Sequence, residues 1–323
     1  MVSPSHLRRL GRTDIHVSPV AMGTWPLAGI SSINVTDEAS IATLQAAVDA
    51  GINFFDTAYV YGYTGESERL MARALGRRRK EIVIASKGGL EWGPDKKQVR
   101  NGRPETIKRH CEESLKRLGT DVIDLYYLHA PDVNTPLAES AGAFRELLDA
   151  GKIRAVGVSN FEQVTQFEEF SAVCPISADQ PPYNMLQREI ETTTLPWCRA
   201  NGVSVMPYWP LMKGLLAGKL PRNHQFDPND KRLTYPLFQG EEWQKNQDFL
   251  DSIRPIAEES GKTVAQLAIA WVIQRPGITS ALCGAKRPEQ IRETAVAMDW
   301  TFTPDQLARI DHAITERGPV KAR

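Results

Sequence analysis

Three side chains that can hold or transfer a proton stand at the ends of short apolar segments. Asp56 ends GINFFD, Lys87 ends EIVIASK and His129 ends VIDLYYLH. A carboxylate beside an ammonium keeps the ammonium charged, and that charge would lower the pKa of a nearby phenol from its usual value of about 10. A phenol of lowered pKa is a usable acid. If the three segments end at one place, they predict proton transfer to or from a bound substrate.

Two phenols follow Asp56 in the segment DTAYVYG, at Tyr59 and Tyr61. Tyr61 directly precedes Gly62, where a tight turn would bring its ring back over the same place. His129 would then hydrogen-bond a substrate oxygen. The alternative is that Asp56 pairs with the lysine only for stability and that His129 satisfies a buried backbone group. We favour the catalytic interpretation because the residues lie on successive apolar segments.

Short segments rich in Val and Ile alternate along the chain with longer segments of helical period. These elements must position the residues named above. The eight expected strands are VSPVAMG, GINFFD, EIVIASK, VIDLYYLH, IRAVGVSN, PISADQ, GVSVMPY and GITSALCG. Candidate helices begin near Thr36, Gly65, Pro104, Pro136, Phe161 and Glu189. Eight βα units without a glycine-rich turn after the first strand favour an α/β fold of the closed (β/α)₈ TIM barrel type over an open dinucleotide-binding sheet.

Residues 1–323 are expected to form a single barrel domain with additions at both ends. The segment LRRLGRTDIHVS predicts a short N-terminal hairpin, and TFTPDQLARIDHAI has the period and the Thr-Pro-Asp start of an extra C-terminal helix. The stretch from about Lys219 to Gln247 interrupts the alternation with three prolines and many polar residues. It is therefore predicted to be a long loop after the seventh strand, near the ligand.

Composition favours a small-molecule partner over nucleic acid or a membrane. Lys and Arg number 39, as do Asp and Glu, so the net charge is zero and no global field attracts a polyanion. A cytoplasmic location is expected, because the first residues lack the apolar run of a signal peptide and no stretch approaches the roughly 18 apolar residues of a membrane helix. The scattered Cys111, Cys174, Cys198 and Cys283 have no zinc or disulfide spacing, so free thiols and no metal are expected. The oligomeric state stays open.

Four segments together resemble the aldo-keto reductase family, and the resemblance runs from about residue 9 to 309. FFDTAYVYGYTGESERLMARAL is similar to its first signature, VIASKGG to its catalytic-lysine strand, LYYLHAPD to its histidine strand and GKIRAVGVSNF to its second signature. The resemblance implies reduction of aldehydes or ketones, including sugar-derived ones, with NADPH and with Tyr61 as proton donor. Asp56 and Lys87 would tune Tyr61, and His129 would orient the carbonyl.

The resemblance also implies a nicotinamide ring across the barrel mouth. Its carboxamide would be held by Ser159, Asn160 and Gln180, and its ring would stack on Tyr208. Further cofactor contacts are implied along WPLMKGLLAGK, which resembles the family's pyrophosphate loop, and CGAKRPEQIRET, which resembles its adenosine-phosphate clamp. The residues in matching places are Leu211, Lys213, Gly214, Leu215, Gly284, Ala285, Lys286, Gln290, Glu293 and Thr294.

The basic pair Lys286 and Arg287, with no acidic residue to bind a ribose, favours NADPH over NADH because only NADPH carries a 2′-phosphate. The sequence departs from the family pattern at three places near the ligand. Thr294 stands where the family usually has Asn, Trp209 where it has Ser, and Ala130 where Trp is frequent.

Trp25 and Trp92 follow the first and third strands and are predicted to wall a substrate pocket. Two other functions fit the same residues. One is an NAD(P)-dependent sugar or alcohol dehydrogenase that runs the chemistry in the opposite direction, and the other is a nicotinamide-binding regulatory subunit with slow turnover. An enzyme that uses Lys87 as a Schiff-base nucleophile is disfavoured, because the adjacent Asp56 keeps the amine protonated.

Overall fold

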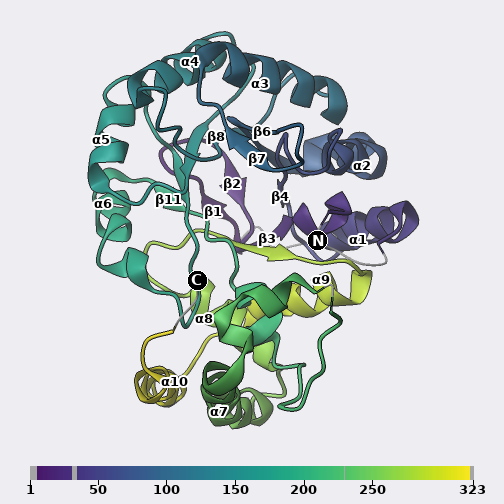
Figure 1. Cartoon of the computed structure of the whole chain (residues 1–323), viewed down its shortest axis with the longest axis vertical. Coiled ribbons are helices and arrows are strands. Elements are labelled where there is room, and N and C mark those ends of the chain that lie inside the picture. Colours follow the sequence, from purple (N-terminus) through teal and green to yellow (C-terminus); the bar gives the residue numbers. More distant parts are fainter. Residues whose placement is uncertain (1–5, 31–34, 229, 321–323) are drawn as a thin grey trace.

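Eight parallel strands form the centre of the computed structural model, which describes residues 6–30, 35–228 and 230–320 (Figure 1). The strands are β3 (Val20–Gly23), β4 (Phe54–Asp56), β5 (Val83–Gly88), β8 (Leu125–Leu128), β9 (Val156–Ser159), β10 (Ala178–Gln180), β11 (Ser204–Val205) and β12 (Ala281–Gly284). They lie in the order β11-β10-β9-β8-β5-β4-β3-β12. The two end strands also meet, since Thr279 N donates to Val205 O (2.8 Å) and Leu282 N to Pro207 O (2.9 Å). The predicted (β/α)₈ barrel is confirmed.

Helices connect the strands and cover the outer face of the barrel (Figure 1). The first six are α1 (Asp37–Asp49), α2 (Glu66–Leu75), α3 (Pro104–Leu118), α4 (Leu137–Asp149), α5 (Val164–Ser171) and α6 (Thr194–Asn201). Local signals set their ends: the Thr36 hydroxyl accepts from Ala39 N at the start of α1, and Pro104 is the first residue of α3. Near Glu189 the chain forms only a 3₁₀ turn, η4 (Glu189–Glu191), and α6 begins after it.

The segment after β11 is more helical than predicted. The expected loop of about 219–247 ends early, because α7 (Gly240–Glu259) follows two 3₁₀ helices, η6 (Lys231–Thr234) and η7 (Pro236–Phe238). Trp243, Phe249, Leu250 and Ile253 are buried along one side of α7, at a spacing that favours a helix despite the polar residues between them. The sequence reasoning also missed α8 (Val264–Ile273). All ten of its residues are buried, so it has no polar face to reveal its period.

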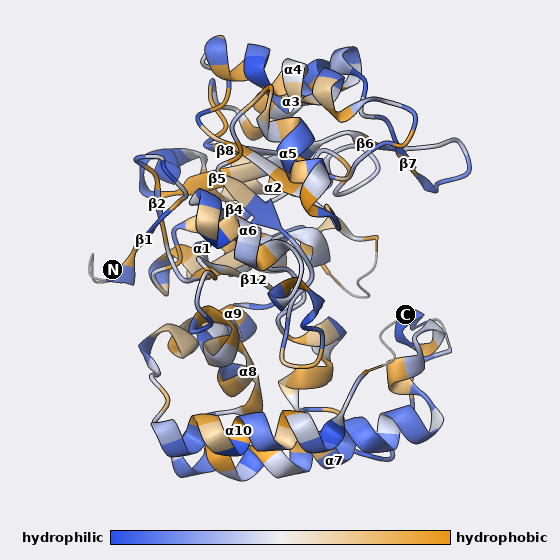
Figure 2. Ribbon diagram, turned by 90° about the vertical axis from the view of Figure 1, so that its left-hand side faces the viewer, coloured by the Kyte–Doolittle hydropathy of each residue, from blue (hydrophilic) through white to orange (hydrophobic). Residues whose placement is uncertain are grey.

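Additions stand at both ends of the chain, as predicted. The N-terminal hairpin pairs β1 (Arg8–Arg9) with β2 (His16–Val17), and it buries Leu10, Ile15 and Val17 against the barrel interior. After β12, α9 (Pro288–Ala295) completes the ring of helices. The C-terminal helix α10 (Pro304–Arg317) then lies along α7, outside α8 (Figure 2).

A hairpin that was not predicted follows β5. Its strands β6 (Leu90–Trp92) and β7 (Gln98–Arg100) pair antiparallel and extend away from the barrel (Figure 2). Because it leaves the C-terminal end of β5, it stands at the rim of the barrel mouth, where βα loops carry ligand contacts in this architecture.

The interior of the barrel is filled by apolar side chains below the mouth, among them Phe54, Leu125, Tyr127 and Met206. Gly157 faces the Tyr127 ring so closely that a Cβ atom would overlap it, so the strand β9 needs a glycine there. The four cysteines are free, as expected, and all four are buried. Among the described residues, no helix combines the length and the apolar character needed to cross a membrane.

Candidate active site

Asp56, Lys87 and His129 come together at the mouth because β4, β5 and β8 are neighbouring parallel strands. The Lys87 Nζ atom donates to Asp56 Oδ1 at 2.5 Å, to the backbone oxygen of Thr57 at 2.8 Å and to Tyr61 Oη at 3.3 Å. The side chains of Lys87 and Asp56 are 0% and 3% exposed. A buried ion pair therefore contacts the phenol that the sequence singled out.

Tyr61 lies between two aromatic neighbours. Its ring centroid is 5.9 Å from that of His129 and 5.0 Å from that of Trp25, with edge-on geometry in both cases. Tyr59, the other phenol of the same loop, points elsewhere: its hydroxyl donates to Glu113 and its ring stacks on another histidine. Of the two phenols, only Tyr61 faces the lysine.

Burial dominates the electrostatics of this cluster. It lowers the pKa of Lys87 and raises the pKa of Asp56, while the attraction within the pair opposes both shifts. Burial, and secondarily the Asp56 charge, raises the pKa of Tyr61 well above its usual value. The expectation of a lowered phenol pKa is therefore wrong for this structure, because lost hydration outweighs the lysine charge. The Tyr61 hydroxyl consequently keeps its proton at neutral pH.

His129 is neutral, because burial and the nearby Lys87 charge lower its pKa well below the usual value. Within the described part of the chain its Nδ1 atom is buried and has no hydrogen-bond partner. A neutral imidazole beside Tyr61 can hydrogen-bond a carbonyl oxygen without competing for the proton.

The loop that carries Tyr61 is held from the β6–β7 hairpin. The indole Nε1 of Trp92 donates to the backbone oxygens of Val60 (3.0 Å) and Gly62 (2.9 Å), the two neighbours of Tyr61. Gly62 has φ 103°, and a Cβ atom there would lie 2.7 Å from the backbone nitrogen of Glu66. Trp92 thus has a positioning contact that sequence reasoning missed, since the hairpin itself was not predicted.

The residues implied to hold the nicotinamide line the opposite side of the mouth, after β9, β10 and β11. Here they form one hydrogen-bonded network. Tyr208 Oη donates to Asn160 Oδ1 (2.9 Å), and Asn160 Nδ2 donates to the backbone oxygen of His129 (2.9 Å). Ser159 Oγ donates to the backbone oxygen of Gln180 (2.8 Å). The side chain of Gln180 then donates from Nε2 to Asp56 Oδ2 (2.9 Å). The network links the amide groups directly to the buried ion pair.

The predicted pyrophosphate loop folds as the 3₁₀ helix η5 (Met212–Ala217), which has unusual backbone geometry. Trp209, Met212 and Lys213 have φ of 59°, 44° and 57°, a conformation that side chains other than glycine seldom adopt. The Lys213 ammonium lies over the Trp209 ring at 3.1 Å and over the Tyr235 ring at 4.1 Å. Nearby, Lys219 Nζ pairs with Glu293 Oε2 of α9 at 2.5 Å. These contacts connect the loop to the segment that carries Tyr235 and to helix α9. Of the other implied residues here, Leu215 is buried and Leu211 packs against the core.

The adenosine-phosphate segment gathers more positive charge than the sequence suggested. Burial and the charges of Arg232 and Arg287 lower the pKa of Lys286, while Asp230 opposes the shift. Arg232 comes from η6 and pairs with Asp230 (2.6 Å). The sequence reasoning missed Arg232, because nothing in the loop's composition shows that the folded loop brings it near Lys286.

The remaining residues of this segment differ in orientation. Gly284 is exposed at the end of β12, whereas Ala285 is buried. Gln290 turns its side chain toward the loop before α9, where its Oε1 accepts from Lys286 N (2.8 Å). Thr294 is buried, and its hydroxyl donates to the backbone oxygen of Ile291, so the structure gives it a contact within its own helix.

Comparison with known proteins agrees with this geometry. Residues 19–315 match the model of the Aldo/keto reductase family. The chain is 37% identical to aldo-keto reductase YhdN of Bacillus subtilis (strain 168), covering 93% of this chain and 90% of that protein, and 34% identical to the NADH-specific methylglyoxal reductase of Escherichia coli (strain K12), covering 90% and 92%. It superposes on the solved glycerol dehydrogenase AKR11B4 of Gluconobacter oxydans with a TM-score of 0.91, at 36% identity and coverage of 98% and 97%.

Proposed function

Because this chain belongs to the aldo/keto reductase family, we propose that it reduces aldehydes or ketones, sugar-derived ones included, to alcohols with NADPH and with Tyr61 as general acid. The family makes it an NAD(P)H-dependent oxidoreductase. The observation that carries the finer proposal is the buried Lys87 ammonium, which contacts Asp56 at 2.5 Å and the Tyr61 hydroxyl at 3.3 Å.

In the proposed mechanism, Tyr61 donates a hydrogen bond to the carbonyl oxygen and transfers its proton as that oxygen gains negative charge. The Lys87 ammonium then faces the phenolate left on Tyr61 and stabilises it, while Asp56 keeps the ammonium in place. The neutral His129 ring orients the carbonyl through a second hydrogen bond. When bound, the reduced dinucleotide supplies the hydride that the carbonyl carbon accepts. No metal takes part in the proposed mechanism.

The residues at the mouth suit a dinucleotide. The amide and hydroxyl groups of Ser159, Asn160 and Gln180 offer the donors and acceptors that a carboxamide needs, and the half-buried Tyr208 offers a ring face. At the other end Lys286 lies near the charges of Arg232 and Arg287, and of the described carboxylates only Asp230 is found to act on it, so positive charge is in excess there.

That excess supports NADPH over NADH, since a 2′-phosphate accepts charge-assisted hydrogen bonds from such a group. Family membership alone would not favour either cofactor, because one relative is named as NADH-specific. The preference of this chain therefore rests on Lys286, Arg287 and Arg232.

The test is consumption of NADPH by the purified protein with a panel of aldehydes, ketones and aldoses. Tyr61→Phe removes the acid and keeps the ring between Trp25 and His129, so turnover should fall by about 100-fold or more while NADPH still binds. Near-normal turnover in that variant would refute the assignment of Tyr61.

Oxidation of an alcohol is the second candidate, and the similarity to a glycerol dehydrogenase favours it. The same residues would act in reverse, with Tyr61 accepting the proton. Reduction of NADP⁺ with polyols, measured beside NADPH consumption, decides which direction is faster. A regulatory subunit with slow turnover would instead bind NADPH tightly and turn over none of these substrates.

A further inference from the structure

The loop that carries Tyr61, residues 57–65 between β4 and α2, is held from helix α3 as well as from the β6–β7 hairpin. Arg117, in the last turn of α3, donates from Nη1 to the backbone oxygen of Tyr59 at 3.3 Å, and its guanidinium lies 4.4 Å from the centroid of the Tyr59 ring. At the other end of the loop, a Cβ atom on Gly65 would lie 2.6 Å from Arg117 Cδ. One side chain therefore contacts the loop on both sides of Tyr61.

Tyr59 joins this anchor to the strand that carries Lys87. Its backbone N–H donates to the backbone oxygen of Lys87 at 3.0 Å, and its backbone oxygen is the one that accepts from Arg117. Its side chain lies against α3, where its hydroxyl donates to Glu113 at 2.9 Å. The backbone that places the Tyr61 hydroxyl 3.3 Å from the Lys87 ammonium is thus fixed between β5 and α3.

Arg117 is held in turn by two carboxylates. It pairs with Glu68 of α2 at 3.3 Å and with Glu113 of α3 at 3.2 Å. The Glu68 side chain is fully buried, and its Oε1 atom accepts from the hydroxyl of Ser86, the residue before Lys87, at 2.7 Å. Because a planar guanidinium with several bound partners has little freedom to turn, Arg117 offers the loop a rigid contact.

We propose that Arg117 is a positioning residue for the proton transfer assigned to Tyr61, an inference that rests on the proposed function. By holding the loop backbone at Tyr59 and packing against Gly65, Arg117 sets the Tyr61 hydroxyl against the Lys87 ammonium. A shift of about 1 Å in a reacting group can slow turnover about 100-fold. Loss of the contact should therefore lower turnover without changing what the mouth binds.

The test is Arg117→Lys. Lysine keeps a positive charge opposite the buried Glu68, so the protein should fold, but it lacks the planar fork that reaches both carboxylates and the Tyr59 oxygen at once. We expect kcat for carbonyl reduction to fall about tenfold or more, while KM and the affinity for NADPH change less than about twofold. Amide hydrogen exchange of residues 57–65 should become faster, a readout that needs neither substrate nor cofactor.

Arg79→Lys is the matched control for a role in stability alone. Arg79 also pairs with a buried carboxylate, Asp124 at 2.8 Å, and donates to a backbone oxygen, that of Val122 at 2.9 Å. These contacts lie before β8, at the amino ends of the strands, whereas the mouth lies at their carboxyl ends. Both variants should lower the melting temperature, but Arg79→Lys should leave kcat unchanged.

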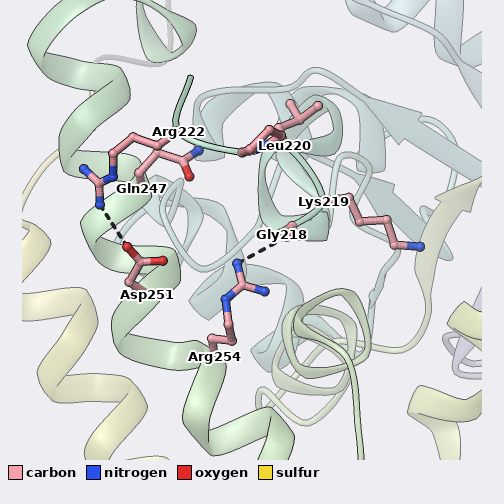
Figure 3. Close-up of a pocket in the computed structure, with 8 residues that line it drawn as sticks. Gly218, Lys219, Leu220, Arg222, Gln247, Asp251 and Arg254 are labelled. Atoms are coloured by element: carbon pink, nitrogen blue, oxygen red, sulfur yellow. Dashed lines mark hydrogen bonds and ion pairs between the residues drawn. The ribbon is translucent and has the colours of Figure 1, made fainter. Parts of the chain in front are cut away.

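Arg254→Lys is the matched control for the loop readout. Arg254 of α7 donates to the backbone oxygen of Gly218, in the loop after η5, at the same distance of 3.3 Å (Figure 3). This loop carries no residue of the cluster around Tyr61. Hydrogen exchange of residues 57–65 should therefore be the same in Arg254→Lys as in the wild type.

The inference requires both effects of Arg117→Lys. It is overturned if either kcat or the hydrogen exchange of residues 57–65 stays at the wild-type value in that variant, or if Arg79→Lys slows turnover as much. Normal kcat in Arg117→Lys beside lost turnover in Tyr61→Phe would overturn this inference alone. Near-normal turnover in Tyr61→Phe would overturn the assignment of Tyr61 in the proposed function together with it.

Discussion

The substitution Trp92→Phe separates two roles for this residue, a wall of the substrate pocket and a support for the catalytic loop. Phenylalanine keeps an aromatic ring but removes the Nε1–H that donates to the backbone oxygens of Val60 (3.0 Å) and Gly62 (2.9 Å). One N–H shared between two acceptors is a three-centre hydrogen bond, so about 0.5–1.5 kcal/mol of support for the Tyr61 position is lost. If that loss falls on the transition state, kcat drops by about 2- to 13-fold.

The assay is steady-state NADPH consumption with the best substrate of the panel. We expect kcat to fall while KM for the carbonyl and the affinity for NADPH change little. Tyr63→Leu is the matched control, because Tyr63 lies 5.0 Å from the Trp92 ring and is exposed. Unchanged kcat with a raised KM in Trp92→Phe would refute the supporting role and leave Trp92 as a pocket wall.

Three further predictions concern the charged and titratable groups. Lys87→Met leaves the buried Asp56 unpaired, so it should abolish turnover and cost about 3–5 kcal/mol of unfolding free energy. A second change, Asp56→Asn, should restore part of that free energy. Denaturant unfolding measures both effects, and a single variant as stable as the wild type would contradict the reasoning. Burial lowers the pKa of His110 from 6.5 to about 4, so the neutral form is favoured in the folded state, and about 3 kcal/mol of stability is lost as the pH falls from 6.5 to 4. His110→Gln should remove that part of the pH dependence of unfolding, and an unchanged dependence would assign it to other groups. Lys286→Ala and Arg232→Ala should each weaken NADPH more than NADH in direct binding measurements; equal losses would remove the 2′-phosphate argument.

The eight strands and the positions of Asp56, Lys87 and His129 could be predicted from the sequence because their signals are local. Most of the predicted strands are short apolar runs between segments of helical period, and parallel strands of a barrel end at one mouth whatever their separation in the chain. The phenol pKa could not be predicted in the same way. Its direction depends on how much water Tyr61 loses, and that burial is a property of the packed loop.

The parts that sequence reasoning missed depend on contacts between segments distant in the chain. The helix α8 is apolar on every side because α7, η5 and the 3₁₀ helix η8 (Val296–Asp299) pack around it, so its sequence resembles a buried strand. The β6–β7 hairpin has no turn signal of the Asn-Gly kind. Arg232 lies in a polar stretch, and only the folded loop brings it near Lys286.

The barrel mouth has two halves, and the contacts that hold the residues of each half in place are different. Asp56, Lys87 and Tyr61 are fixed by adjacent strands and by one short turn, so their geometry persists as long as the barrel does. The half that we propose to bind the cofactor phosphates depends on η5 and η6, which are held by the Lys213 ring contacts and by the ion pair between Lys219 and Glu293. Changes in these loops should therefore alter cofactor preference and substrate range while the Asp56–Lys87–Tyr61 cluster keeps its geometry, because β4 and β5 hold that cluster and are paired with each other.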